Sequence, residues 1–210
     1  MIFQQKLTHW RYLLQAAYQD TKEWMEAQQF TEEVQPGQPR RSPNSKRNEW
    51  KRPEMGFVKC NYDGSFYNIN TPAQAGWLIR DSTGLFKGAG QFKTRKPHNA
   101  LESELQALLG AMMICWSQGY TKVIFEGDNI NVINLLKKRT KNINVVNWLR
   151  DIWKWEQKFE SLQYTWTNRE SNSCADLLAK QQLQDNDEYI YHPCIPNVIR
   201  DVISVDYFDH

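Results

Sequence analysis

The stretch FVKCNYDGSFYNINTPAQAGWLIRDSTGLFKGAGQF, residues 57–92, decides the fold of this 210-residue chain. It contains three segments with strand-like composition, Phe57–Phe66, Ala73–Arg80 and Leu85–Phe92, separated by clusters of Asn, Asp, Gly and Pro. Such clusters are typical of turns, because these residues favour the backbone conformations that turns require. We therefore expect three strands joined by short turns, which is the pattern of an antiparallel meander.

The residues after this meander alternate between helical and strand patterns. Apolar residues recur at helical spacing in Leu101–Gln118, and Gly119 is a typical helix stop. The other elements we expect are a strand, two helices, a strand and a helix, at Lys122–Phe125, Asn129–Lys138, Val145–Phe159, Leu162–Thr167 and Asn172–Gln182. This order predicts an α/β fold in which a mixed sheet carries helices on its faces.

Composition divides the chain into four parts. Residues 1–34 carry apolar side chains at helical spacing and predict a helical segment. Residues 35–54 contain four prolines and six Lys or Arg, which predicts a basic, flexible linker. The folded domain is expected over residues 55–182, followed by an acidic C-terminal tail over residues 183–210. Val198–Val205 is the one stretch of the tail that suggests a short structural element.

The net charge of +2 conceals an uneven distribution. Residues 1–54 sum to +2, residues 55–182 to +5 and residues 183–210 to −5. A basic domain favours a polyanionic partner such as nucleic acid, although ordinary solvated charge explains the count alone equally well. The acidic tail is a candidate to dock on the basic domain and compete with nucleic acid.

Membrane and secreted classes are not favoured by the composition. The longest apolar runs fall far below the roughly 18 residues that span a bilayer, and the first residues lack the apolar stretch of a signal peptide. The four cysteines stand far apart without a C-x-x-C pair, which favours a reducing compartment and argues against a zinc site. We expect an intracellular protein, nuclear or cytoplasmic, without a membrane partner.

Four acidic residues stand in unusual places. Asp63 lies inside a predicted strand, where Asp is depleted, and Glu104 borders the apolar stripe of a helix. Asp128 lies between an apolar strand and a helix, and Asp176 lies near the start of the last helix. Each has a structural explanation: a turn, a solvated helix acid, an N-cap, or the preference of Asp for helix N-termini. By periodicity alone Glu102 is as good a candidate as Glu104.

Together these acids fall on elements that would line one edge of the predicted sheet. Clustered carboxylates repel one another and are forced to protonate unless a cation joins them. Mg²⁺, with Mn²⁺ as a substitute, suits an all-carboxylate site that retains water. Two such ions about 4 Å apart are a known arrangement for phosphodiester cleavage, in which one activates water and the other stabilises the leaving oxygen.

Five motifs follow one another along the chain. They are WKRP with GFVKCNYDGS at 50–53 and 56–65, AGWLIRDSTG at 75–84, SELQAL at 103–108, FEGDN at 125–129 and NRESNSCADLLAK at 168–180. In this order they resemble the ribonuclease H type 1 domain, and in particular the plant branch associated with non-LTR retroelement reverse transcriptases. The resemblance covers Phe57–Gln182. It implies a ribonuclease H-like fold, with a five-stranded mixed sheet of three antiparallel and two parallel strands flanked by helices.

The resemblance also implies a metal-dependent endonuclease. It selects Glu104 over Glu102 as the catalytic Glu. The residues implied to ligate two Mg²⁺ ions are Asp63, Glu104, Asp128 and Asp176, with Asp63 shared by both ions. An activated water would attack the scissile RNA phosphate and leave a 3′-hydroxyl and a 5′-phosphate.

The implied substrate is the RNA strand of an RNA–DNA hybrid, which its 2′-hydroxyls distinguish from DNA. The residues implied to contact it are Gly64, Ser65 and Asn172. The chain departs from bacterial members in two respects: the loop 167–171 holds no His, and the basic protrusion is missing. Its nearest substitutes, which helix C-capping explains equally well, are Lys137, Lys138, Arg139 and Lys141.

Two other functions remain open at this point. A retroelement-derived protein that binds nucleic acid with little or no catalysis fits the missing His, although the presence of all four acids favours the enzyme. A protein-interaction module would use Trp10, Trp24 and the predicted N-terminal helix as its contact face. Cleavage of a hybrid, abolished by Asp63→Asn, would distinguish the enzyme from the binding protein.

Overall fold

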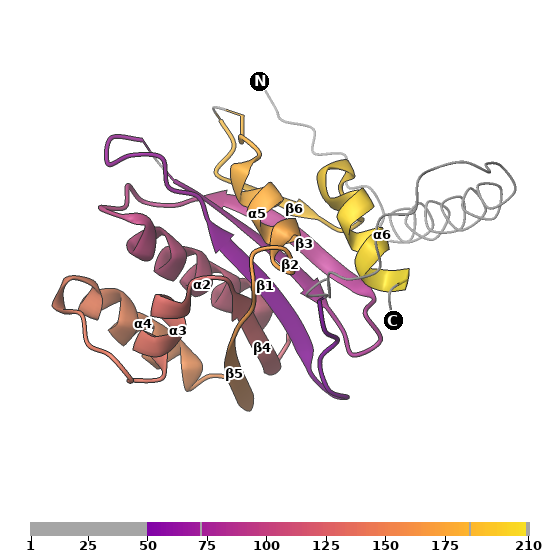
Figure 1. Cartoon of the computed structure of the whole chain (residues 1–210), viewed down its shortest axis with the longest axis horizontal. Helices are drawn as coiled ribbons and strands as arrows, with labels where there is room; N and C mark the ends of the chain where they lie inside the picture. The colour runs from indigo at the N-terminus through magenta and orange to yellow at the C-terminus, as the bar shows by residue number, and fades with distance from the viewer. Residues whose placement is uncertain (1–49, 72, 185, 209–210) are drawn as a thin grey trace, which may run out of the picture. The chain divides into compact units, whose positions relative to one another are not determined.

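A twisted sheet with helices on both faces forms the core of the molecule (Figure 1). This computed structural model describes residues 50–71, 73–184 and 186–208, so the predicted helical segment 1–34 and most of the predicted linker lie outside the described residues. The strands are β1 (Val58–Gly64), β2 (Gln74–Arg80), β3 (Phe86–Lys93), β4 (Lys122–Gly127), β5 (Ser161–Trp166) and β6 (Tyr189–His192). The helices are α2 (Ala100–Ser117), α3 (Ile130–Leu136), α4 (Val146–Glu156), α5 (Ser173–Lys180) and α6 (Arg200–Phe208), with 3-10 turns η1 (Ile143–Val145) and η2 (Asn197–Ile199).

The strands are ordered β5-β4-β1-β2-β3-β6. β1, β2, β3 and β6 pair antiparallel in succession, whereas β1–β4 and β4–β5 are parallel. The predicted mixed α/β fold is confirmed, but the expected count of five strands is wrong. The sixth strand, β6, lies in the segment predicted as an acidic tail and pairs with β3, where His192 lies opposite Ala89. It is only four residues long and is preceded by acidic residues, so its alternation was too short to predict a strand.

Each face of the sheet buries its own apolar core, because successive strand residues point to opposite faces. In β2, Trp77 and Ile79 belong to the larger core, which also contains apolar residues of α2 and α4. Leu78, between them in the sequence, belongs to a second core with Leu178 of α5 and residues of the C-terminal segment. In Figure 1, α2, α3 and α4 gather on one side of the sheet, and α5 and α6 on the other.

Both ends of the described chain pack onto the domain. Trp50, which the sequence placed in the linker, is only 1% exposed. Ile199 and Ile203 of the C-terminal segment are buried against Leu78 and Leu178. In addition, Asp206 of α6 pairs with the buried Arg80 of β2, 2.6 Å away. The C-terminal segment therefore contributes a strand, a helix and part of a core to this fold.

Helix α2 begins and ends as its sequence indicates. The Asn99 side chain caps it by accepting a hydrogen bond from the Glu102 backbone N–H, 2.9 Å away. Gly119 follows the helix with a φ of +83°, the left-handed conformation that glycine adopts at low cost. The Glu102 carboxylate accepts hydrogen bonds from the His98 backbone and from the Trp148 indole, so Glu102 secures this end of the helix.

The structure also describes the state of the cysteines and the apolar character of the helices. All four cysteines are free, and Cys60 and Cys115 are buried in the larger core between β1 and α2. Within the described ranges, none of the helices combines the length and apolarity needed to cross a bilayer.

Candidate active site

Asp63 lies at the C-terminal end of β1, opposite Gly76 of β2. It is 6% exposed, while its neighbour Tyr62 points into the larger core. Pairing with β2 continues through Asp63 to Gly64, so Asp63 is part of the sheet rather than the first residue of a turn. A carboxylate in this position is held rigidly at the edge where the strand ends.

Glu104 is brought beside Asp63 by a close approach of helix α2 to Gly64. A β-carbon on Gly64 would lie 2.5 Å from the Ser103 carbonyl oxygen and 2.9 Å from the Glu104 nitrogen, so only glycine fits. The contact is fixed by a hydrogen bond from the Ser103 hydroxyl to the Ser65 carbonyl oxygen, 2.8 Å long. The Gly64 backbone N–H also donates to the Glu104 carboxylate, which points this side chain toward the end of β1.

Asp128 follows β4, which is parallel to β1, so both strands end at the same edge of the sheet. It is not the cap of the next helix, because the Asn129 side chain caps α3 by accepting from the Asn131 N–H. The Asp128 carboxylate is therefore free of that role. Its backbone oxygen accepts a 2.9 Å hydrogen bond from the indole of Trp166, which holds the turn against the end of β5.

Asp63, Glu104 and Asp128 form a carboxylate cluster in which one oxygen from each lies within 4.8 Å of the others. Glu104 Oε2 is buried and has no hydrogen-bond partner among the described residues. Three converging carboxylates with an unpaired buried oxygen are the donor set that a hard divalent cation prefers. The cluster thus has the composition and spacing of a metal site.

The electrostatics of the carboxylate cluster show how poorly it tolerates three negative charges. Burial, followed by the charges of Asp128 and Asp176, raises the pKa of Asp63 to about 7. Burial and the charges of Asp63 and Asp128 raise the pKa of Glu104 well above its usual range. Burial also raises the pKa of Asp128, against the opposing effect of Arg169. A bound cation would relieve this repulsion and restore the ionised carboxylates.

Asp176, the fourth predicted ligand, lies in the first turn of α5 and is engaged by two cations. Its Oδ1 lies 3.5 Å from Arg169 Nη2, and its Oδ2 lies 2.7 Å from Lys180 Nζ. It is near enough to raise the pKa of Asp63, but it is not one of the three residues whose oxygens converge. Helix α5 reaches this position because Gly76 leaves room for the backbone of Ala179 and Ala175, which a β-carbon there would meet at 2.4 and 2.5 Å.

The three predicted substrate-binding residues lie next to the carboxylate cluster but differ in access. Gly64 is partly exposed. The Ser65 side chain is buried and bonded to the backbone of Gln74 in both directions, at 3.0 Å each. Asn172 has no exposed surface, and its amide donates to the Tyr62 carbonyl oxygen and accepts from Asn61. Its side chain therefore positions β1, and a direct contact between Asn172 and substrate stays a prediction.

A buried polar network lies on the same sheet face as the cluster, and the sequence analysis did not identify it. Asn61 donates to Asn172 and to Glu126, and it accepts from the Trp50 indole and from Arg80. Asn61 lies two residues before Asp63 on β1, and Glu126 on β4 lies two residues before Asp128, which follows that strand, so both point to the side of the cluster. A polar residue at that spacing in each strand was the available signal. The network connects β1 and β4 to both ends of the described chain, through Trp50 and through Arg80 with its partner Asp206.

Arg169 lies in the motif at 168–180, and the motif alone predicts no role for it. Its Nε lies 4.0 Å from Asp128 Oδ2, so its guanidinium lies between Asp128 and Asp176. The Arg169 side chain is 74% exposed and comes from the loop that holds no His. Its position seven residues before Asp176 gave no periodicity signal, because the two residues belong to a loop and a helix.

Comparisons with known proteins agree with this geometry. The family described as reverse transcriptase-like matches residues 61–182, more than half of the chain. No curated protein sequence matches the chain. Among solved structures, RNase H1 from the halophilic archaeon Halobacterium salinarum NRC-1 is similar, at 22% identity and a TM-score of 0.56, over 59% of this chain and 95% of that one.

Two further structures show the same likeness. The N-terminal RNase H domain of a Mycobacterium tuberculosis protein has 19% identity and a TM-score of 0.53, over 59% of this chain and 90% of that one. LC11-RNase H1, isolated from compost and solved in complex with an RNA/DNA hybrid, has 19% identity and a TM-score of 0.52, over 58% of this chain and 92% of that one. At these identities the likeness establishes a ribonuclease H-like fold.

Proposed function

Because this chain belongs to the reverse transcriptase-like family, we propose that it is a ribonuclease H-type endonuclease that hydrolyses the RNA strand of RNA–DNA hybrids. The observation that carries the proposal is the convergence of Asp63, Glu104 and Asp128 at the edge where β1 and β4 end. An acidic cluster alone would be weak support. Here it combines with an unpaired buried oxygen on Glu104 and with a fold that solved RNases H share.

The proposed cofactor is Mg²⁺, two ions, with Mn²⁺ as a substitute. Asp63, Glu104 and Asp128 would hold one ion, and Asp63 with Asp176 would hold the other. The ions would supply the positive charge that activates water and stabilises the leaving 3′ oxygen, so that the products carry a 3′-hydroxyl and a 5′-phosphate. The chain's own contribution is rigidity: Asp63 is fixed in a strand, and Glu104 by the approach of α2 to Gly64.

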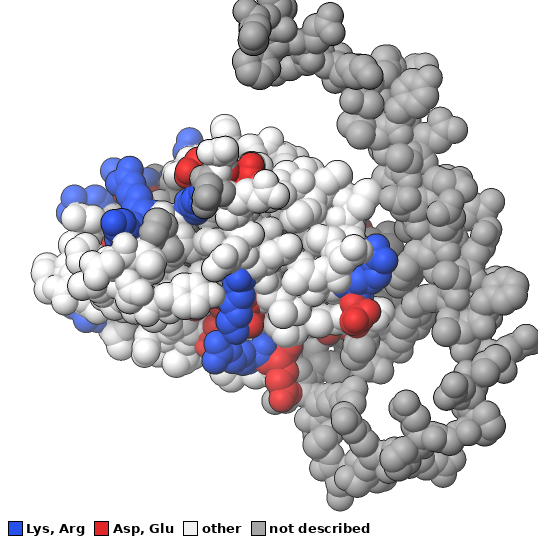
Figure 2. Space-filling model, turned by 90° about the horizontal axis from the view of Figure 1, so that it is seen from above, with Lys and Arg blue, Asp and Glu red and all other residues white. Residues whose placement is uncertain are grey.

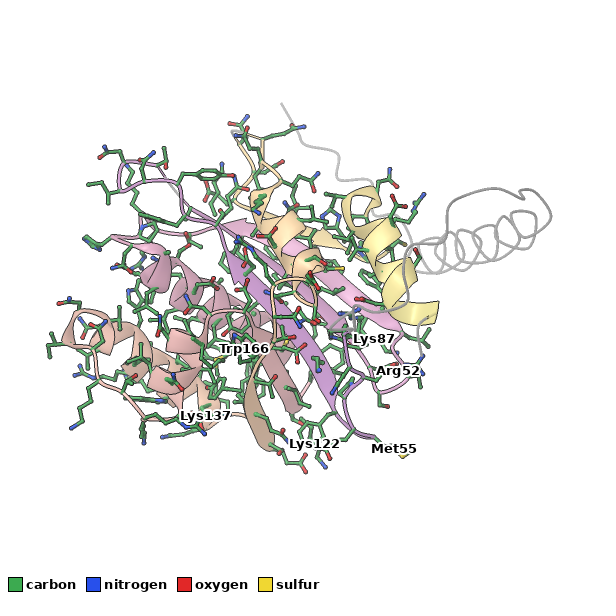
Figure 3. All side chains as sticks on the ribbon, in the orientation of Figure 1. Arg52, Met55, Lys87, Lys122, Lys137 and Trp166 are labelled. Atoms are coloured by element: carbon green, nitrogen blue, oxygen red, sulfur yellow. The ribbon has the colours of Figure 1, made fainter. Side chains whose placement is uncertain are left out.

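We propose that the RNA strand is recognised beside the carboxylate cluster through its 2′-hydroxyl groups. Gly64 and Ser65 lie at the end of β1, so their segment is where the sugar next to the scissile phosphate would pass. Asn172 supports this segment from inside by holding the Tyr62 carbonyl oxygen. Trp166, which Figure 3 labels near the middle of its view, is half exposed and borders Asp128. It offers an apolar ring beside the site.

The DNA strand of the hybrid would contact exposed cations at the end of α3. These are Lys137, Lys138, Arg139 and Lys141, all of them exposed. Lys137 ends the helix as its C-cap and lies toward the lower left of the molecule in Figure 3. Figure 2, which shows the molecule from above, has its charged side chains in separate groups on a mostly uncharged face.

We also propose to which branch of the family this chain belongs. The motifs at 56–65, 75–84 and 168–180 support membership of the plant branch associated with non-LTR retroelement reverse transcriptases. That branch generally has no His in the loop before the last helix, and here Arg169 occupies this loop. The alternative function, a retroelement-derived protein that binds nucleic acid with little or no catalysis, is the other outcome of the following experiment.

The proposal is tested with a hybrid in which the RNA and DNA strands carry different labels, incubated with Mg²⁺. We expect the parent protein to cleave only the RNA strand and Asp63→Asn to bind the hybrid without cleaving it. Asp201→Asn, an exposed acid on α6 far along the chain from the motifs, is the matched control and should cleave normally. If all three proteins bind the hybrid without cleaving it, the proposed enzyme is wrong and the alternative, a nucleic-acid-binding protein, is favoured.

A further inference from the structure

The carboxylate cluster and Asp176 differ in how their negative charge is balanced. Within the cluster, Glu104 Oε2 has no partner among the described residues, and one oxygen of each acid lies within 4.8 Å of the others. Asp176 has a cation on each oxygen: Arg169 on Oδ1 at 3.5 Å and Lys180 on Oδ2 at 2.7 Å. One side of the site thus attracts a cation strongly, while the other side already holds two side-chain cations.

Lys180 and Arg169 are held in different ways. Lys180 lies one helical turn after Asp176 on α5, the i,i+4 spacing at which oppositely charged side chains meet. Arg169 comes from the preceding loop, reaches Asp128 at 4.0 Å as well as Asp176, and leaves 74% of its side chain exposed. Arg169 therefore lies at the side of the cluster that faces Asp176, and it can leave that position without disturbing the core.

We infer that Arg169 and Lys180 occupy the second half of the metal site, so that the two divalent ions bind with unequal affinity. This inference rests on the proposed function, because it assigns the second ion to Asp63 and Asp176. The first ion enters the cluster of Asp63, Glu104 and Asp128, which is poor in positive charge. The second requires that Asp176 exchange its contacts with Arg169 and Lys180 for the ion. Arg169 and Lys180 are then positioning residues that set the order of metal loading.

The size of the effect follows from the contacts that are exchanged. Arg169 and Lys180 are both more than half exposed, so solvent screening limits what each contact contributes to holding Asp176. Removing one of the two cations should therefore increase the affinity for the second ion by about two- to fivefold. The affinity for the first ion should rise less, because Arg169 is farther from Asp128 than from Asp176, and Asp176 is the acid that Lys180 contacts within the described ranges.

The test counts bound Mn²⁺ by electron paramagnetic resonance at pH 8, with calorimetry for the affinities, on the full chain without nucleic acid. We expect the parent to bind one ion tightly and a second ion much more weakly. Arg169→Gln and Lys180→Gln should each lower the dissociation constant of the second ion by about two- to fivefold. Arg169→Lys, which keeps the charge, should stay near the parent. Lys154→Gln removes an exposed cation that pairs with Asp151 on α4. It is the control and should not change the affinity for either ion.

Each outcome decides the inference. If the parent binds two ions with equal affinity, or if neither Gln variant changes the affinity for the second ion, Arg169 and Lys180 do not set the order of metal loading. The proposed function would still stand in that case. Binding of no divalent ion by the parent would overturn the proposed function itself. Because the readout is a count of bound metal, an inactive but folded variant still gives a decisive answer.

Discussion

The backbone of Ser103 lies so close to Gly64 that a β-carbon on Gly64 would stand 2.5 Å from the Ser103 carbonyl oxygen. This approach joins β1 to the first turn of α2, and it sets the distance between Asp63 and Glu104. The two acids are neighbours of the contact, each one residue away from it. The geometry of the carboxylate cluster therefore depends on a glycine whose own chemistry takes no part in binding.

Gly64→Ala should separate the two acids. The added methyl group meets backbone atoms, which cannot rotate away, so helix α2 must move. We expect a loss of about 1–3 kcal/mol in the free energy of unfolding, measured in urea, and a weaker affinity for Mn²⁺. Gly110→Ala is the comparison variant: its β-carbon would lie 2.1 Å from the Phe92 ring, so it should also lower stability, but it should leave the Mn²⁺ affinity unchanged because it displaces a side chain and not the backbone beside Glu104. An unchanged Mn²⁺ affinity in Gly64→Ala would contradict the role of this contact.

Asp63 should make the metal-free protein less stable as the pH rises. Its pKa is about 7 in the folded protein and near 3.8 in the unfolded chain, so the folded state binds more protons between these values. Stability then falls as the pH rises through this window. We expect the free energy of unfolding of metal-free Asp63→Asn to exceed that of the parent by about 1–3 kcal/mol at pH 8 and to equal it near pH 4.

Thermal and urea unfolding at the two pH values, with a chelator present, measure this difference. Addition of Mg²⁺ at pH 8 should raise the stability of the parent and leave that of Asp63→Asn nearly unchanged. A variant no more stable than the parent at pH 8 would show that the cluster carries no electrostatic strain.

The ion pair between Arg80 and Asp206 should be essential to the fold. Arg80 is 2% exposed, contacts the Trp50 ring at 3.4 Å and donates to Asn61, so losing Asp206 leaves a buried charge without its carboxylate. We expect Asp206→Ala to lower the free energy of unfolding by about 3 kcal/mol. Asp201→Ala, on the exposed side of the same helix, should change it by less than about 0.5 kcal/mol. If Asp206→Ala and Asp201→Ala lower the free energy of unfolding equally, the ion pair between Arg80 and Asp206 is not essential to the fold.

The cations after α3 should contribute to hybrid binding without affecting metal binding. Replacing Lys137 and Arg139 by Gln removes two exposed charges, so the slope of log affinity against log salt should fall by about 2. Mn²⁺ affinity should stay at the parental value. Lys154→Gln again serves as the control. A salt slope identical to the parent's would assign Lys137 and Arg139 to the capping of α3 alone.

The sequence predicted the part of the fold that depends on local patterns. The alternation in residues 57–92 indicated β1, β2 and β3, and the spacing of α2 and its stop at Gly119 were also apparent. Strand β6 was missed, since four residues carry little periodicity and its pairing with β3 is a long-range contact. The burial of Trp50 was missed for a similar reason: its partners Asn61 and Arg80 are recognisable only in the folded chain.

The candidate site was predictable to the extent that it follows from topology. Asp63 and Asp128 end parallel neighbouring strands, so their meeting is a consequence of the sheet. The choice of Glu104 over Glu102 needed the direction of the helix, and the structure shows Glu102 turned toward Trp148 instead. The burial of Asn172 and the two cations on Asp176 depend on side-chain packing, which spacing along the chain does not encode.

The most direct test of the central claim is an anomalous scattering map from crystals of the protein soaked in Mn²⁺. We expect a peak coordinated by Asp63, Glu104 and Asp128, and its loss in crystals of Asp63→Asn grown under the same conditions. A map with no peak among these three carboxylates, at a Mn²⁺ concentration that supports cleavage by other RNases H, would contradict the claim that this cluster is a metal centre.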